Sequence, residues 1–311
     1  MFFAEPLELD RSLRQLQSIY GSVGNELRGW NWINDLLSPP LEGIYLGVSE
    51  VANRYCPTYR DIYLRRVLGK SAPYTHKTVR GWIYHAISSR TVQEVKSTLY
   101  RRGPCSGTKL LIHLSQTKKE VLDSIFARYG ASRYLRGQEM LKLRRNAEAL
   151  YDYLVLQAAA RLDRVLSKTT KTPELESIMA KVVPMDVERL VNGRLLGLSH
   201  ELRVDLFTDR RIVVDIKTGE VRPFHKYVLA GYALAIESDL EIPIDFGVVS
   251  YISVDEGFVK VKNTVHFIGD ELRREFIEMR DEAFNIIHSG LDPGKPPTCS
   301  EHCIYYDVCN R

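Results

Sequence analysis

Long hydrophobic runs are missing from this 311-residue sequence. The longest, Val228–Ile236, has nine residues and contains Gly231, whereas a bilayer crossing needs roughly 20. The first residues, MFFAEPLELDRSLRQ, lack the basic-then-apolar order of a secretory signal. We therefore expect a cytoplasmic protein that makes no membrane contact.

Internal repeats, low-complexity tracts and long linkers are also missing, which argues against solenoids and disordered chains. No G-x4-G-K-[S/T] segment occurs, so this chain carries no P-loop helicase motor of its own. Hydrophobic residues make up 44% and charged residues 26% of the sequence. This composition is that of a globular protein with one large domain or two smaller ones.

Acidic residues are scarce in one part of the chain. Residues 51–110 contain twelve Lys or Arg but only Asp61 and Glu94 as acids, although the net charge of the whole chain is only +4. Residues 255–311 have the opposite balance, with seven bases and eleven acids. A local basic surface suits a polyanion such as nucleic acid, but charge alone fits a solvated helical face equally well.

Apolar periodicity predicts a mostly helical first half and a mixed second half. Helical spacing covers Asp10–Tyr20, Ser49–Gly69 with Ser49 as the N-cap, Thr78–Arg102, and Thr117–Leu166 with a break near Gly130. Alternation typical of strands covers Val182–Leu190, Leu195–Phe207, Arg211–Lys217, Phe246–Val254 and Phe258–Phe267, with helices at Pro223–Glu237 and Asp270–His288. We expect an α/β (α+β) protein with a mixed central sheet wrapped by helices. Its regions would be a helical part (1–180), a sheet-containing core (181–290) and an irregular cysteine-rich tail (291–311).

Two carboxylates and a lysine mark the segment ELRVDLFTDRRIVVDIKTG, residues 201–219. Strand alternation puts Asp205, and separately Asp215 and Lys217, on the faces opposite the apolar side chains of their strands. A three-residue loop, Asp209–Arg211, would place Asp205 directly across from Asp215. Converging carboxylates repel one another unless a cation lies between them, and Mg²⁺ or Mn²⁺ prefers such oxygen ligands.

That metal interpretation competes with an ordinary half-exposed hairpin, because a D-x-K pattern alone is common on exposed strands. The upstream segment Gly81–His85 supports the metal, since a neutral imidazole is a good Mn²⁺ ligand. A single histidine in a chain with eight is nevertheless more often structural.

The chain has five cysteines, and three of them follow a C-x3-C-x5-C pattern at Cys299, Cys303 and Cys309. Cys56 lies far upstream, and Cys105 is most simply a spare buried thiol. Disulfides are rare in a cytoplasm, so metal ligation by four thiolates is favoured. Zinc sites usually show two CxxC-like pairs. The spacing of one plus three therefore favours an iron–sulfur cluster over zinc and would tie Cys56 to the C-terminal segment.

Together these motifs resemble those of RecB-like nucleases of the PD-(D/E)xK superfamily that carry a four-cysteine iron–sulfur cluster. The resemblance is closest to the archaeal Csa-one branch of the CRISPR-associated exonuclease family, Cas-four. The matching parts are Gly47–Arg65 around the first cysteine, the histidine motif Gly81–His85, the residues Asp205, Asp215 and Lys217, and the three C-terminal cysteines. Residues 1–46 and 103–180 contain no motif of this family.

The resemblance implies a restriction-endonuclease-like core and metal-dependent exonuclease cleavage of DNA ends, mainly single-stranded. The biological role would be the processing of pre-spacers in CRISPR adaptation beside the integrase, and ring-shaped oligomers occur in the family. The implied ligands of Mn²⁺ or Mg²⁺ are His85, Asp205, Asp215 and the carbonyl of Ile216, and Lys217 would orient the attacking water. A structural cluster, 4Fe–4S or alternatively 2Fe–2S, would be bound by Cys56, Cys299, Cys303 and Cys309.

One family motif, Gln-x3-Tyr, is altered, because Val228 stands at the glutamine position while Tyr232 is kept. His225 and Lys226 either replace that glutamine in part or lie on a solvated helix face. Two other functions therefore stay open. One is a non-catalytic DNA-end-binding subunit of the adaptation complex, and the other is a RecB-type repair nuclease that works with a separate helicase.

Candidate DNA contacts are Arg65, Arg66 and Tyr232, since bases interleaved with aromatics can clamp and stack on a single strand. The tyrosines at 55, 59 and 63 recur every four residues. For these three, a packed helix stripe is the simpler interpretation.

Overall fold

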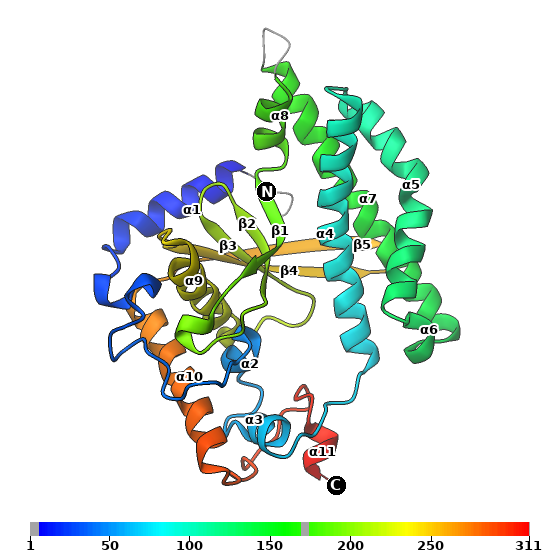
Figure 1. Ribbon diagram of the computed structural model, residues 1–311. Helices are drawn as coiled ribbons and strands as arrows, with labels where there is room; N and C mark the ends of the chain where they lie inside the picture. Colours follow the sequence, from blue (N-terminus) through cyan, green and yellow to red (C-terminus); the bar gives the residue numbers. More distant parts are fainter. Residues whose placement is uncertain (1–5, 169–173, 311) are drawn as a thin grey trace.

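A five-stranded mixed sheet lies at the centre of the computed structural model, which describes residues 6–168 and 174–310 (Figure 1). Its strands lie in chain order: β1 Met185–Val191, β2 Leu202–Thr208, β3 Ile212–Lys217, β4 Phe246–Asp255 and β5 Phe258–Phe267. Neighbouring strands are antiparallel except β3 and β4, which are parallel. A parallel pair needs a crossover, and α9 Lys226–Leu240 provides it. The expected mixed sheet surrounded by helices is confirmed.

One face of the sheet is covered by the long helices of the first half. These are α4 His76–Arg102, α5 Gly107–Arg128, α7 Gly137–Ser167 and the short α6 Ala131–Tyr134 and α8 Leu175–Val182. Ile212, Val214 and Ile216 of β3 belong to one apolar cluster with buried side chains of α4, α5 and α7. The predicted break at Gly130 is present, and this glycine has the left-handed φ of 55° that ends α5.

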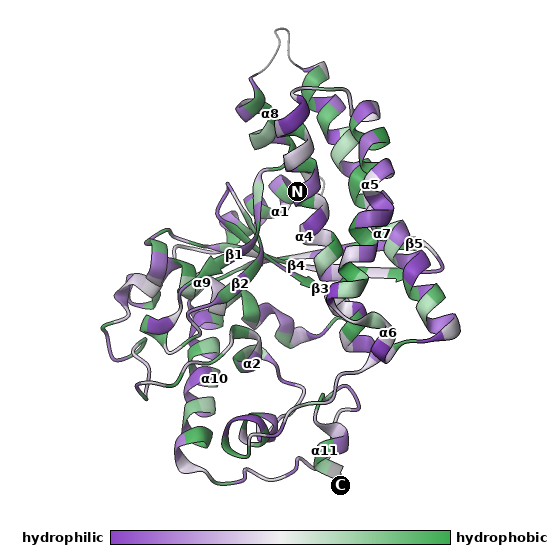
Figure 2. Ribbon diagram, turned by 45° about the vertical axis from the view of Figure 1, so that its right-hand side comes forward, coloured by the Kyte–Doolittle hydropathy of each residue, from purple (hydrophilic) through white to green (hydrophobic). Residues whose placement is uncertain are grey.

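The opposite face is covered by α2 Val48–Ala52, α9 and α10 Asp270–Ser289. Helix α1 Pro6–Ile19 lies beside β5 and contributes Leu9 to the apolar cluster of the first face. Helix α9 is apolar nearly all round, and Figure 2 shows its hydrophobic colouring together with that of the central strands. Gly231 lets α10 approach closely, because a Cβ there would lie 2.5 Å from the Phe276 ring and 2.7 Å from Val48. Val213 and Phe207 point to this side of the sheet.

A buried charge network joins α9, α10 and the N-terminal loop that contains the 3-10 turns η1 Asn25–Leu27 and η2 Gly29–Asn31. The Glu237 carboxylate is fully buried and accepts hydrogen bonds from Arg273 at 2.7 and 2.9 Å and from Arg28 at 2.7 Å. The N–H groups of Gly29 and Ile244 also donate to it. A buried ion is tolerated only when it is paired and fully hydrogen-bonded in this way.

Several boundaries differ from the sequence prediction, and α5 begins at Gly107 instead of Thr117. Ser49–Gly69 is not one helix: α2 ends at Ala52, and α3 Arg60–Ile62 and a π-helical turn, η3 Tyr63–Val67, follow a loop. Pro57 disfavours helix in the residue before it, and Tyr59 takes a left-handed φ of 53°. The N-cap of α2 is Gly47, whose N–H donates a hydrogen bond to the carboxylate of Glu50 at 3.2 Å.

The predicted strand Leu195–Phe207 begins later than expected. The 3-10 turn η4 Arg194–Leu196 occupies its first part and ends at Gly197, which has a φ of 69°. Val182 belongs to α8 and not to β1. The remaining elements are η5 Pro223–His225 before α9 and a short α11 Tyr306–Asn310 within the tail expected to be irregular.

Among the described helices, none has an apolar stretch long enough to cross a membrane. The expectation that the first residues do not form a secretory signal concerns in part residues 1–5, which lie outside the described range.

Candidate active site

The β2–β3 hairpin brings Asp205 and Asp215 to adjacent strands. The ladder pairs Leu206 with Val214 and Phe207 with Val213, so the same register continued by one residue puts Asp205 opposite Asp215. The connecting loop has three residues, Asp209–Arg211, as the sequence predicts for this register. The N–H of Ile216 donates to Asp205 Oδ2 at 2.7 Å, which anchors the first carboxylate to the second strand.

His85 reaches this hairpin from α4. Its Nδ1 lies 3.3 Å from Asp205 Oδ1. The helix passes close to the end of β3 because Gly81 has no side chain, and a Cβ there would lie 3.3 Å from Thr218 Oγ1. Burial opposes protonation of His85, but the Asp205 carboxylate outweighs it and raises the imidazole pKa. Burial would raise the pKa of Asp205, but His85 and the Ile216 N–H lower it.

Asp215 forms the second half of the site with Lys217. The side chain of Asp215 is only 5% exposed, and Lys217 Nζ lies 2.9 Å from its Oδ2. Hydrogen-bond geometry is met only with Oδ1, at 3.2 Å, so Oδ2 accepts no hydrogen bond from any described residue. Burial raises the pKa of Asp215, and Asp205 adds to this while Lys217 opposes it. The hairpin is therefore not the half-exposed one that the simpler interpretation assumed.

The donor groups fit a hard divalent cation. Two carboxylates and an imidazole converge, and one buried carboxylate oxygen lacks a hydrogen-bond donor. In the described parts of the chain, no three His, Cys, Asp or Glu side chains are arranged to enclose a metal ion. Instead the site consists of two ion pairs, His85–Asp205 and Asp215–Lys217. A cation between the carboxylates would relieve the repulsion that now raises the pKa of Asp215.

Sequence analysis missed Tyr251 and gave His225 only an open role. Tyr251 pairs with Lys217 across β3 and β4, and its hydroxyl lies 3.1 Å from His225 Nδ1. His225 is 6% exposed, and burial together with Lys217 and Arg222 lowers its pKa to about 4. It is thus a buried neutral imidazole beside the site, whereas Lys226 is half-exposed. The alternation of side chains between the two faces of β4 was the one sequence signal that could have pointed to Tyr251.

The two positions of the altered motif lie under the site. Val228 is 3% exposed and packs in the apolar cluster of α9. Tyr232 is 8% exposed, and its hydroxyl donates to the carbonyl of Arg203 at 2.9 Å. Burial and the two aspartates raise the pKa of Tyr232 well above its ordinary value. This position suits a residue that supports the carboxylates, and its contact with DNA stays a prediction.

Arg65 and Arg66 are balanced by one acid. Arg66 donates to the two oxygens of Glu50 at 2.7 and 2.6 Å, and Arg65 Nε lies 3.8 Å from the same carboxylate. Tyr59 is fully buried beneath the Arg54 guanidinium, 4.4 Å from its ring centroid. Tyr55 packs edge-on against Phe224 at 4.9 Å, so this side chain also makes packing contacts.

The loop that contains Cys56 is held to the C-terminal segment, and Figure 1 shows α3 and α11 side by side. Thr58 Oγ1 donates to the carbonyl of Gly294 at 2.8 Å. Arg60 forms a two-point ion pair with Asp292 at 2.8 and 2.7 Å. A third link joins the Tyr305 hydroxyl to the carbonyl of Lys70 at 3.0 Å. We call these contacts the clasp.

The four cysteines of the predicted cluster influence one another. Burial raises the pKa of Cys303 to about 11, and Cys56 and Cys309 add to the shift. The pKa of Cys309 is raised by burial, by Cys56 and by Cys299. All five cysteines are free thiols. Their mutual influence shows that they lie near one another, although in the described part of the chain no three of them are arranged to enclose a metal, so the cluster stays a prediction. Cys105 packs apart from them against the helical cluster.

Comparison with known proteins identifies the family. The family model of the CRISPR-associated exonuclease Csa1 matches residues 1–311. The CRISPR-associated exonuclease Csa1 of Saccharolobus solfataricus is 36% identical over 314 residues, covering 100% of each chain. The protein of the same name from Thermoproteus tenax is 32% identical over 309 residues, covering 97% of this chain and 98% of its own. The chain therefore belongs to the CRISPR-associated exonuclease Csa1 family.

Proposed function

We propose that this protein is a metal-dependent exonuclease that degrades DNA from its ends, mainly single-stranded DNA. Its role would be to prepare pre-spacer DNA for CRISPR adaptation, beside the integrase and as a monomer or an oligomer. Two relatives that span the whole chain carry the name CRISPR-associated exonuclease, which supports the activity class. The substrate strand, the end chemistry and the adaptation role are parts of the proposal.

The proposal depends mainly on one observation. Two carboxylates face one another on adjacent strands, and a buried oxygen of Asp215 accepts no hydrogen bond from any described residue. His85, Asp205, Asp215 and the Ile216 carbonyl would hold Mg²⁺ or Mn²⁺. When bound, this cation would supply Lewis acidity to the scissile phosphate and to the attacking water. The chain itself provides a dry, preorganised site, because Asp205 is fixed by His85 and by the Ile216 N–H.

Lys217 acts in this proposal as a donor. Burial would lower its pKa, but Asp215 and Asp205 outweigh this and raise it. In the site without a metal this favours the protonated ammonium. It would orient the attacking water by donating a hydrogen bond and would balance negative charge near the phosphate.

The cofactor proposal concerns Cys56, Cys299, Cys303 and Cys309. They would bind an iron–sulfur cluster, 4Fe–4S in the first instance, whose role is to reinforce the clasp between the α2–α3 loop and the C-terminal segment. The support is that burial and neighbouring thiols raise the pKa of Cys303 and Cys309. Visible absorbance and iron content of protein purified without oxygen distinguish 4Fe–4S, 2Fe–2S and zinc.

The test of function is cleavage of end-labelled single-stranded DNA with Mn²⁺ by protein purified anaerobically. Wild type is compared with Asp215→Ala and with Asp209→Ala, a matched control in the exposed loop of the same hairpin. We expect degradation by wild type and Asp209→Ala and none by Asp215→Ala. Equal degradation by all three would assign the activity to another site or to a contaminant.

Val228 favours one second candidate, a non-catalytic DNA-end-binding subunit. The side chain at this position is apolar and buried, so it cannot position a water as an amide does. DNA binding without cleavage by wild type, with the visible absorbance intact, would select this candidate over the nuclease.

A further inference from the structure

Four aromatic side chains gather where the start of α4 meets the end of α5 and α6. Tyr74 contacts Trp82 edge-on at 4.9 Å and lies 6.0 Å from Tyr134, and Trp82 lies 6.0 Å from Tyr129. Tyr74 is 60% and Tyr134 38% exposed. We call these four residues the aromatic patch. Trp82 and Tyr129 are partly buried against the helical cluster, and a connected group of rings with two exposed members is a candidate interaction site.

The chain around the aromatic patch contains no acids. Residues 62–93 and 124–138 lack Asp and Glu entirely, and the fold brings these two segments together at the patch. They contribute a set of basic side chains, Lys77, Arg80, Arg128, Arg133 and Arg136. Arg128 lies over the Tyr129 ring at 5.7 Å. The surface therefore alternates aromatic rings with positive charge.

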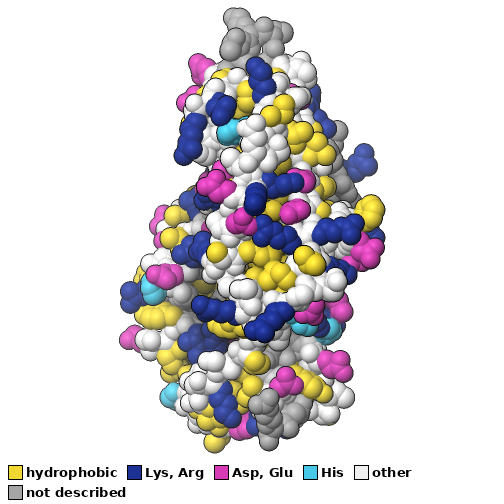
Figure 3. All heavy atoms as spheres, turned by 90° about the vertical axis from the view of Figure 1, so that its right-hand side faces the viewer, with side chains coloured by type: hydrophobic (Ala, Val, Ile, Leu, Met, Phe, Trp, Pro, Cys, Tyr) yellow, Lys and Arg dark blue, Asp and Glu magenta, His cyan; other side chains and the backbone are white. Residues whose placement is uncertain are grey.

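Among the described residues, these basic side chains have no acidic partner, as is also true of Arg101, Arg102, Lys109 and Lys119 on the same helices. Within residues 6–168 and 174–310, no carboxylate lies within 4 Å of any of the five. By contrast, Lys118 pairs with Asp152 and Arg144 with Asp123. Unbalanced cations attract a polyanion and release its counterions on binding. Figure 3 shows the molecule from the right-hand side of Figure 1, where Lys and Arg side chains lie among exposed hydrophobic ones, with Asp and Glu between them.

The patch lies next to the candidate active site. Trp82 precedes His85 by three residues of α4, a rise of roughly 4.5 Å. Gly81, which directly precedes Trp82, faces Thr218 at the end of β3. A strand bound on the patch therefore lies within about one helical turn of the residue that contacts Asp205.

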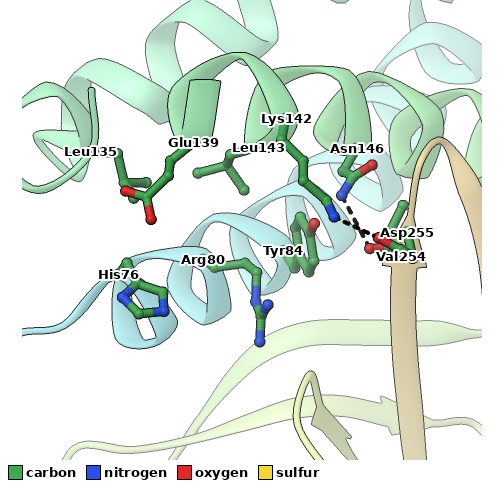
Figure 4. A pocket seen from close by; sticks show the side chains of 10 residues that line it. All are labelled: His76, Arg80, Tyr84, Leu135, Glu139, Lys142, Leu143, Asn146, Val254 and Asp255. Atoms are coloured by element: carbon green, nitrogen blue, oxygen red, sulfur yellow. Dashed lines mark hydrogen bonds and ion pairs between the residues drawn. The ribbon is translucent and has the colours of Figure 1, made fainter. Parts of the chain in front are cut away.

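A pocket lies beside the patch on the side of α4 that faces α7 (Figure 4). It has a volume of about 230 Å³, and its lining combines the basic Arg80 and Lys142 with the acidic Glu139 and Asp255. The hydroxyl of Tyr84 lines it without a hydrogen-bond partner among the described residues. Neither His85 and Asp205 nor the four rings of the patch line this pocket, so it is a separate hollow beside the patch.

We propose that the aromatic patch and its five basic side chains bind single-stranded DNA and guide it to the hairpin carboxylates. The bases would stack on Tyr74 and Trp82, and the basic groups would neutralise the backbone. Duplex DNA hides its base faces, so stacking on exposed rings favours a single strand. The inference relies on the proposed function for its substrate, but it assigns the binding step to residues that have no part in the chemistry.

The test is binding of a dye-labelled oligothymidine to the holoprotein in EDTA, where cleavage is prevented. Tyr74→Ala is compared with Tyr100→Ala, a tyrosine near the far end of α4 with 59% exposure against 60%. Losing one stacked base should raise the Kd roughly 5- to 150-fold for Tyr74→Ala. Tyr100→Ala should bind like wild type. In cleavage with Mn²⁺, Tyr74→Ala should raise KM and leave kcat unchanged.

A second variant measures the charge contribution. Arg133→Ala should reduce the slope of log Kd against log salt by about 0.7, the value for one phosphate of a single strand. Lys118→Ala, whose ammonium is already paired with Asp152, serves as the control and should change the slope less.

The outcomes separate this inference from the proposed function. Equal binding by wild type, Tyr74→Ala and Tyr100→Ala would overturn the patch while cleavage by wild type still supports the nuclease. Equal weakening of single-stranded and duplex binding by Tyr74→Ala would overturn stacking. A wild type that neither binds nor cleaves DNA would overturn the proposed function and the patch together. Circular dichroism and visible absorbance confirm that each variant is folded.

Discussion

The hairpin site brings together two carboxylates, and the segments joined by the clasp bring together four cysteines. In both cases the groups repel one another as anions, but different parts of the structure hold them in place. Asp205 and Asp215 lie on paired strands of a sheet buried on both faces. The cysteines lie on short segments around α3 and α11, linked mainly by side-chain contacts between distant parts of the chain.

The difference concerns where the stability of each site comes from. The backbone ladder positions the carboxylates whether or not a cation is bound, because it is part of the core. The clasp has only three polar links among the contacts described above, and one of them is a partly exposed ion pair between Arg60 and Asp292. We therefore expect the hairpin to keep its shape without a metal and the clasp to depend on one.

The largest expected effect is on cleavage. Asp215→Ala should reduce the rate of DNA degradation by more than about 10³-fold, beyond the effect of removing a single charge-stabilising donor. The visible absorbance of the cluster and the melting temperature should change little, because the variant leaves the clasp intact. Loss of the absorbance in this variant would show that the two sites are not independent.

Cys303→Ala should have the reverse pattern. Structural metal sites contribute on the order of 10 kcal/mol of binding free energy, so losing one thiolate should bleach the protein and loosen residues 291–310. Limited proteolysis of this segment, followed by mass spectrometry, checks the expectation. Cys105→Ala is the control and should keep both colour and protection.

Glu237→Gln tests the core that carries the hairpin, since α9 connects β3 to β4. The change leaves Arg273 buried without its counter-charge and should cost about 3–5 kcal/mol in the free energy of unfolding. Burial opposes ionisation of Glu237, but Arg273 and the backbone donors lower its pKa below the ordinary 4.5. Its contribution is therefore fully present above pH 4.5 and is lost as the pH falls through the folded-state pKa.

Denaturant unfolding of wild type and Glu237→Gln at several pH values measures this contribution. The stability difference between them should shrink as the pH falls below 4.5. A difference that stays constant down to the acid transition would contradict the role of the carboxylate charge.

The smallest expected effect is that of Arg60→Ala. Its ion pair with Asp292 is partly exposed, so its loss should change the free energy of unfolding by less than about 1 kcal/mol. Proteolysis of the C-terminal segment in the holoprotein should stay close to wild type. A large increase would show that the clasp, and not the metal, holds that segment.

The sequence predicted best what depends on neighbours along the chain. The alternation around Asp205, Asp215 and Lys217 and the three-residue loop follow from period-two patterning, and the ladder agrees with them. The mixed sheet is confirmed for the same reason. The start of β2 at Leu202 was missed because the apolar residues of η4 fit the sequence pattern expected of a strand.

What sequence analysis missed depends on contacts between distant segments. The helix predicted through Cys56 breaks in a loop with Tyr59 at positive φ, which helical spacing does not reveal. Tyr251 reaches the site through strand pairing, and the aromatic patch joins Tyr74 to Tyr134 across two helices. The roles of the predicted metal, cluster and DNA-contacting residues stay predictions that the experiments above address.

The clasp also has a consequence for the order in which the protein is made. Cys56 and Thr58 are synthesised more than two hundred residues before Asp292 and Gly294, the partners that close their loop. Cys56 is buried in the folded protein, but it therefore stays uncovered through most of translation. During that interval the thiol is open to oxidation, so the rate of synthesis and the redox state together would influence how many molecules could bind the proposed cluster.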